Sequence, residues 1–278
     1  MGKKVLVINY DICNGCYNCQ VACKDEHVAN DWSPIAKPQP DTGQFWNKVY
    51  DNVRGQVPKV FVTYEHSICQ HCDDAPCIDA CKEKAIYKRD DGIVIIDPDK
   101  CRGHQMCIEA CPYEEVIFFN DDLRISQKCT FCAHLIDDGW EEPRCVDACP
   151  TGAFTFGDED DPKIKALIKK AQPLKPDLKV KPRVYYIGLP KRFIAGALYD
   201  KAEEECVGDA KVTATCAVSG KKVCDTTTDS YGDFWIRDLA DGQYNLLFEK
   251  KGYMSQKFGP VDVTEKDINI GDITLWKA

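Results

Sequence analysis

The spacing of apolar residues changes along the chain and divides it into two parts. Up to about residue 190 the apolar runs are short, and they predict strands at 4–9, 93–97 and 116–120. From about residue 192 apolar and polar residues alternate, which is typical of half-buried strands. Glycine-containing turns separate these later runs at 219–220, 231–233 and 241–242. Short strands at this spacing predict a small β-sandwich over residues 192–278.

Helices are predicted at two places in the first part. Residues 19–27 form the helix that follows the first run of cysteines, and Asp161-Pro162 opens a second helix, with aspartate at the N-cap and proline in the first turn. Repeated prolines then predict an extended strap over 172–191. An insert at 30–65 is rich in large aromatics, which fits either a local core or a partner interface.

Length, charge and hydropathy narrow the class of protein. A chain of 278 residues allows one large domain or two ordinary ones. Its 36 basic and 45 acidic side chains give a net charge of −9, which argues against nucleic-acid binding. No apolar run approaches the ~18 residues of a membrane span, and the N-terminus lacks the pattern of a signal peptide. We therefore expect a cytoplasmic protein, or one exported together with a signal-bearing partner.

Cysteines carry the main chemical signal. The chain has eighteen, and fifteen of them fall at or before Cys149 in four blocks. The blocks are Cys13-x2-Cys16-x2-Cys19-x3-Cys23, Cys69-x2-Cys72-x4-Cys77-x3-Cys81, Cys101-x5-Cys107-x3-Cys111 and Cys129-x2-Cys132-x12-Cys145-x3-Cys149. The first repeats the C-x2-C-x2-C-x3-C run of bacterial ferredoxins, and the third does so with His104 in place of a cysteine.

This spacing has a physical reason. Three closely spaced cysteines can wrap one cubane cluster, and the fourth begins a helix and points towards a partner cluster. The blocks must then work in pairs. Zinc is the alternative, but zinc sites normally use two C-x2-C pairs with a long gap. The closing C-x3-C of all four blocks favours iron–sulfur clusters. We therefore expect an α+β fold of two paired ferredoxin-like modules over residues 1–191.

Four strings carry a family resemblance: residues 69–77, 110–113, 128–132 and 182–187. Together they resemble the four-cluster electron-transfer subunits of molybdopterin oxidoreductases of the dimethyl-sulfoxide-reductase family. The resemblance implies that the first block pairs with the fourth and the second with the third. The implied ligand sets are Cys13, Cys16, Cys19 and Cys149; Cys129, Cys132, Cys145 and Cys23; Cys69, Cys72, Cys77 and Cys111; and Cys101, Cys107 and Cys81 with His104.

His104 departs from the family pattern. Imidazole can ligate iron and raises the potential of Rieske centres. The site could therefore hold a His-ligated four-iron cluster, a three-iron cluster with no fourth ligand, or no cluster.

The insert and the C-terminal part narrow the resemblance to the small subunit of pyrogallol–phloroglucinol transhydroxylase and related anaerobic phenol hydroxylases. The C-terminal part itself resembles prealbumin-like or carboxypeptidase-regulatory-like domains. The implied partner is a large subunit with a molybdenum bound by molybdopterin guanine dinucleotide, and the implied substrates are polyphenols. We expect no substrate site on this chain, because it has no recognisable catalytic motif. The alternatives are a subunit of a respiratory arsenate or sulfur-oxyanion reductase, a free-standing polyferredoxin, and a scaffold with decayed sites.

Overall fold

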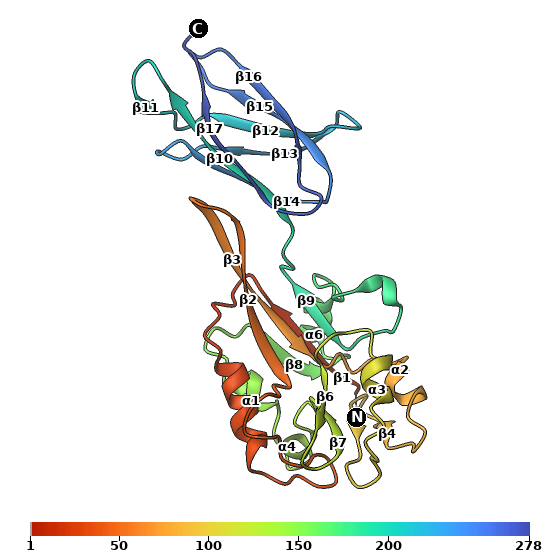
Figure 1. Ribbon diagram of the computed structural model, residues 1–278. Helices are drawn as coiled ribbons and strands as arrows, with labels where there is room; N and C mark the ends of the chain where they lie inside the picture. The colour runs from red at the N-terminus through yellow and green to blue at the C-terminus, as the bar shows by residue number, and fades with distance from the viewer. Residues whose placement is uncertain (1) are drawn as a thin grey trace. The chain divides into compact units, whose positions relative to one another are not determined.

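The computed structural model describes residues 2–278, which form two compact units (Figure 1). One unit contains the residues up to Asp51 and Tyr64–Leu189, and the other contains Asn52–Thr63 and Pro190–Ala278. Strands β2 (Asn47–Gln56) and β3 (Lys59–Ile68) pair as a hairpin, and its tip belongs to the second unit. In the described residues, no helix is both long and apolar enough to cross a membrane.

A three-stranded sheet lies at the centre of the first unit. Strand β1 (Lys4–Asn9) runs antiparallel to β8 (Phe154–Asp158) and parallel to β9 (Val184–Ile187). Val5–Ile8 are buried because this central strand is covered on both faces, as its unbroken apolar run indicates. The prediction of a strand at 4–9 is confirmed.

Short helices and two small hairpins complete the first unit. The hairpins are β4 (Ile86–Lys88) with β5 (Val94–Ile96), and β6 (Ile117–Asn120) with β7 (Ile125–Lys128). The helices are α1 (Asn18–Val28), α2 (Pro76–Asp79), α3 (Met106–Ala110), α4 (Ala133–Asp137), α5 (Arg144–Asp147) and α6 (Pro162–Ile168). The predicted N-cap of α6 is confirmed, since the Asp161 carboxylate accepts hydrogen bonds from the N–H groups of Lys163 and Ile164 at 2.7 and 3.3 Å. The prediction of an extended strap over 172–191 holds only in part: strand β9 is extended, but the segment before it contains a 3-10 turn at Pro176–Leu178 and left-handed residues at Lys179 and Lys181.

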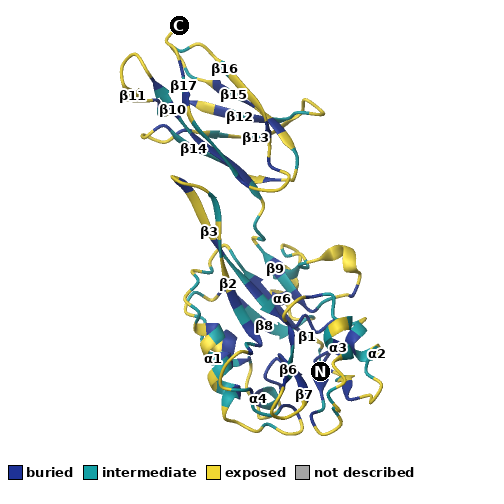
Figure 2. Ribbon diagram, in the orientation of Figure 1, coloured by how far each residue is buried: buried dark blue, intermediate teal, exposed yellow. Residues whose placement is uncertain are grey.

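The second unit is all β. Strand β10 (Arg192–Asp200) pairs with β11 (Glu205–Cys206), β14 (Asp233–Leu239) and β17 (Ile268–Thr274) in one sheet. The other sheet has the order β13 (Lys222–Thr227), β12 (Lys211–Cys216), β15 (Gln243–Glu249), β16 (Gln256–Asp262). Buried and exposed positions alternate along β15 (Figure 2), as expected for a strand with one face on the core.

The hairpin tip is tied to this unit by charge. The Arg54 guanidinium donates from two nitrogens to the two carboxylate oxygens of Asp267, at 2.8 and 2.9 Å. The Asp267 side chain is only 4% exposed. A bidentate pair of this kind fixes both distance and orientation. Lys59 forms a second ion pair with Asp233.

Candidate functional site

The loops of the first and third cysteine blocks share one backbone conformation. Gly15 and Gly103 have φ of 66° and 70°, and Tyr17 and Gln105 have φ of 62° and 58°. Each loop then turns directly into a helix, α1 or α3. A Cβ atom on Gly103 would lie 2.5 Å from the Arg124 carbonyl oxygen, so this turn requires glycine. The two loops therefore have left-handed residues at the same two positions before their helices.

His104 stands at the loop position that Cys16 holds in the first block. Its Nε2 lies 3.1 Å from Oε1 of Glu83. In metal sites the second nitrogen of a histidine ligand is commonly paired with a carboxylate. His104 also lines one pocket together with three cysteines, namely Cys81, Cys101 and Cys107. The structure thus brings together all four side chains that were expected to form this set.

The set at the first block joins residues that lie far apart in the sequence, since Cys149 belongs to the fourth block. Burial, followed by the nearby thiols of Cys13, Cys149 and Cys16, raises the pKa of Cys19 to about 12. Although burial opposes it, hydrogen bonds from Thr151 and from backbone N–H groups lower the pKa of Cys149. Thiols that influence one another in this way lie within short range.

The set at the fourth block is the most deeply buried. Burial raises the pKa of Cys23 well above its ordinary value, and the thiols of Cys129 and Cys132 raise it further. Cys145 is likewise raised in pKa by burial and then by Cys132, Cys23 and Cys129. The structure therefore places Cys23, from the first block, among the thiols of the fourth.

The set at the second block lines a pocket of its own. Cys69, Cys72, Cys77 and Cys111 all face it. Burial, and then the thiols of Cys69, Cys77 and Cys111, raises the pKa of Cys72 to about 12. Cys111, from the third block, thus lies among the thiols of the second.

Thiols of one set also raise the pKa of a thiol in a neighbouring set, which indicates the sets that lie next to each other. Cys19 of the first set raises the pKa of Cys145 in the next. Cys69, in the set at the second block, raises the pKa of Cys129, in the set at the fourth block. Cys107, in the set that contains His104, raises the pKa of Cys77, in the set at the second block. Thiols of successive sets therefore lie near enough to influence one another.

Backbone hydrogens point at several of the sulfurs. Four N–H groups donate to cysteine Sγ atoms: Ala85 to Cys81 at 3.3 Å, Ser126 to Cys101 at 3.4 Å, Phe131 to Cys129 at 3.4 Å and Ala153 to Cys149 at 3.3 Å. Such bonds stabilise negative charge on sulfur, whether in a thiolate or in a cluster.

Lys128 places a buried ammonium group beside two of the sets. Its side chain donates to the backbone carbonyls of Val94 and Cys129, and the residue is 2% exposed. Among the described residues it forms no ion pair with a carboxylate. It counteracts the burial that raises the pKa values of Cys77, Cys111 and Cys129. Lys128 therefore favours negative charge on the sulfurs of these three cysteines.

These donor sets fit iron–sulfur clusters. All eighteen cysteines are free thiols, and thiolate sulfur is the ligand that iron–sulfur clusters require. Within residues 2–278 the structure forms no group of three or more His, Cys, Asp or Glu side chains arranged to hold one metal ion. In a cubane cluster each ligand binds a different iron, so its four ligands need not converge on a single ion.

Sequence reasoning did not assign a contact to His66. Its Nε2 lies 3.6 Å from the Sγ of Cys13, and its Nδ1 lies 3.3 Å from Oδ1 of Asn47. Burial lowers the pKa of His66 to about 4, which keeps the ring neutral at pH 7. Because His66 is far from Cys13 in sequence, no spacing rule could have found this pair.

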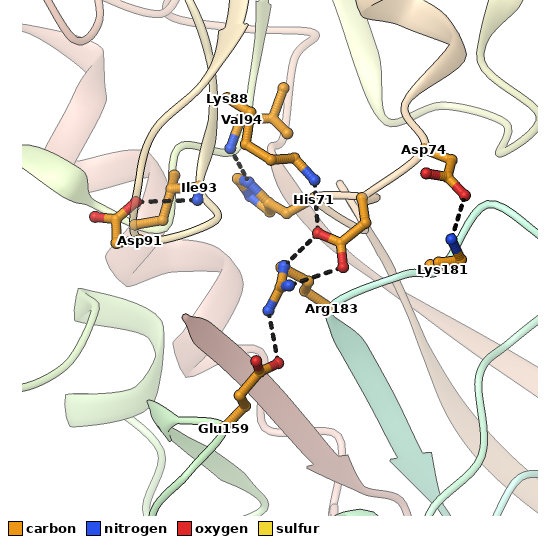
Figure 3. A network of polar contacts seen from close by, with 10 residues as sticks. His71, Asp74, Lys88, Asp91, Ile93, Val94, Glu159, Lys181 and Arg183 are labelled. Atoms are coloured by element: carbon orange, nitrogen blue, oxygen red, sulfur yellow. Dashed lines mark hydrogen bonds and ion pairs between the residues drawn. The ribbon is translucent and has the colours of Figure 1, made fainter. Parts of the chain in front are cut away.

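An ion network fixes the strap against the second block (Figure 3). Arg183 donates to both carboxylate oxygens of Asp73 at 2.8 Å and to Glu159 at 3.0 Å. Its side chain is 4% exposed. Lys88 donates to the same Asp73 carboxylate at 2.7 Å. The network holds the loop of the second block in place.

Comparison with known proteins identifies two domains and several relatives. Residues 60–159 match the 4Fe-4S dicluster domain, and residues 194–275 match the carboxypeptidase regulatory-like domain. The chain is 32% identical to the pyrogallol hydroxytransferase small subunit of Pelobacter acidigallici, with 99% of this chain and 100% of that one covered. It is 33% identical to the arsenate respiratory reductase iron–sulfur subunit of Shewanella sp. (strain ANA-3), with 66% and 94% covered. It is also 33% identical to a tetrathionate reductase subunit of Salmonella typhimurium, with 69% and 75% covered.

Proposed function

The chain belongs to the family of iron–sulfur electron-transfer subunits of molybdopterin oxidoreductases, and from that premise we propose that it relays single electrons through four clusters. The electrons pass to or from the molybdenum centre of a large subunit that acts on polyphenols. The observation that carries this proposal is the gathering of thiols from different blocks into sets: Cys81 faces one pocket with Cys101, His104 and Cys107, and Cys111 faces another with Cys69, Cys72 and Cys77. Thiols of successive sets also influence one another. A relay needs closely spaced sites in series.

The proposed ligands follow the sets described above. The first cluster takes Cys13, Cys16, Cys19 and Cys149; the second takes Cys129, Cys132, Cys145 and Cys23; the third takes Cys69, Cys72, Cys77 and Cys111; and the fourth takes Cys101, Cys107, Cys81 and His104. Each bound cluster would accept and release one electron. The chain holds the sulfurs in place, surrounds them with buried residues and directs N–H groups at them.

His104 fits the fourth ligand position for two reasons. It replaces a cysteine on a loop with unchanged backbone conformation, and its Nε2 pairs with Glu83. A carboxylate at this nitrogen leaves Nδ1 as the ligating atom and increases the basicity of the ring. Histidine ligation would give this cluster a higher potential than a four-cysteine site.

The choice of polyphenols rests on the extent of similarity. The pyrogallol hydroxytransferase small subunit aligns along 99% of this chain, including the C-terminal domain. The arsenate respiratory reductase subunit aligns along 66%. That second relative supports a respiratory reductase as the alternative function. The cytoplasmic location remains a prediction, tested by cell fractionation.

Anaerobic purification of the native complex tests the proposal. We expect a large molybdenum-containing subunit to co-purify, and about sixteen irons per small subunit, from four clusters of four irons. After reduction with dithionite, a polyphenol that loses one hydroxyl group as water should accept two electrons and two protons and so re-oxidise the complex. Re-oxidation by arsenate or tetrathionate alone would favour the alternative, and a colourless protein without acid-labile sulfide would refute both.

A further inference from the structure

His71 and Phe131 hold equivalent positions in two cysteine blocks. Each is the third residue of its block, in Cys69-Gln70-His71-Cys72 and in Cys129-Thr130-Phe131-Cys132. Both have left-handed backbones, with φ of 46° and 50°. Their rings stack on each other, with centroids 3.8 Å apart and planes inclined by 28°. Stacking therefore accounts for an aromatic ring at both positions. It does not explain why the ring of residue 71 is an imidazole with two nitrogens.

One of those nitrogens has a defined role. The backbone N–H of Val94 donates to Nδ1 of His71 at 3.0 Å (Figure 3). A nitrogen that accepts a hydrogen bond carries no hydrogen itself, and a neutral imidazole has one N–H. The ring hydrogen of His71 is therefore on Nε2, and strand β5 fixes this tautomer.

The other nitrogen is left without a partner. His71 is 1% exposed, and its Nε2 forms no hydrogen bond with any residue that the structure describes. A buried N–H donor without an acceptor is unfavourable, and native proteins rarely tolerate one. His71 also lines the pocket faced by four thiols, those of Cys69, Cys72, Cys77 and Cys111. The acceptor is therefore expected in this pocket.

We propose that Nε2–H of His71 donates a hydrogen bond to a sulfur of the cluster in this pocket, and thereby raises the reduction potential of that cluster above the value it would have with phenylalanine at this position. The inference rests on the proposed function, since it requires a cluster at this site. Reduction adds negative charge to the sulfurs, so a donor stabilises the reduced state more than the oxidised state. The second cluster has Phe131 at the equivalent position and lacks this donor.

The substitution His71→Phe tests the proposal in the native complex. It gives the second block the aromatic residue of the fourth and keeps a ring for stacking. At a fixed potential, the ratio of reduced to oxidised protein should fall about tenfold for one couple, which corresponds to a shift of about 59 mV for one electron. The other three couples should keep their potentials. EPR-monitored redox titration measures all four.

A variant with an altered third cluster shows whether the shifted redox couple belongs to that cluster. In a Cys77→Ser variant, whose third cluster is already altered, adding His71→Phe should leave the other three couples unchanged. Substitution of His71 by Gln should recover part of the shift, because its amide can accept from Val94 and also donate. A shift of a different couple would overturn the assignment.

A second readout detects the contact itself instead of its effect on the potential. With 15N-labelled histidine, pulsed EPR of the reduced complex should show coupling between an imidazole nitrogen and the third cluster, and the coupling should vanish in His71→Phe. If clusters are present but both the coupling and the potential shift are absent, the inference is wrong. If no clusters are present, the proposed function itself fails.

Discussion

Two ion pairs join the strap to the loop of the second block, and they should differ greatly in strength. Arg183 pairs with Asp73, and the two side chains are 4% and 29% exposed. Lys181 pairs with Asp74 at 2.9 Å, and these side chains are 70% and 59% exposed. Figure 3 shows Lys181 and Arg183 reaching from the same segment. The pairs are thus matched in location and differ in burial.

We expect Arg183→Ala to destabilise the first unit by about 3 kcal/mol. Hydrogen bonds to charged groups contribute about 1.5–3 kcal/mol each, and the buried Arg183 guanidinium makes them to both Asp73 and Glu159. The total stays near the value of one such bond, because both carboxylates are partly exposed and Asp73 keeps its bond to Lys88. At about 2–4 °C per kcal/mol, the melting temperature should fall by roughly 6–12 °C. Lys181→Ala should cost about 1 kcal/mol or less, because exposed pairs are weak.

Thermal unfolding of the cluster-loaded protein under anoxic conditions, followed by circular dichroism, measures both variants. The reasoning depends on the difference between them. It would be refuted by equal decreases in melting temperature, or by a decrease in Arg183→Ala no larger than that in the exposed control.

Three further changes test the proposed clusters. Cys13→Ala should remove about four of sixteen irons per chain, whereas Cys206→Ala should leave the iron content unchanged, and colorimetric iron analysis decides between them. His104→Cys should lower the potential of one cluster if imidazole is its ligand, while a gain of iron would indicate a three-iron cluster in the unsubstituted protein. Lys128→Met should lower the potentials of the second and third clusters by removing a buried positive charge, and redox titration with all four potentials unchanged would contradict this role.

Local features of the fold were predictable from the sequence because their signals are short-range. The central strand at Lys4–Asn9, the Asp161 cap and the alternating strand at Gln243–Glu249 all follow from neighbouring residues. The family resemblance supplied the expected pairing between cysteine blocks, and the structure brings the same side chains near one another.

Other features depend on contacts between residues far apart in sequence. Strand β10 was not predicted, because it pairs on both sides and most of its residues are buried, so it shows no alternation. The stacking of His71 on Phe131 joins two cysteine blocks, and the contact of His66 with Cys13 joins strand β3 to the first block. No local pattern encodes such contacts.

The Arg54–Asp267 pair has a consequence for how this chain can be divided or recombined. A fragment beginning at Pro190 would keep Asp267 at the edge of its core but would lose the guanidinium that neutralises it. Grafting the C-terminal domain onto another protein would therefore require the hairpin tip, residues 52–63, to be transferred as well. Residues 52–63 and 190–278 therefore form one structural module, although residues 64–189 of the first unit lie between them in the sequence.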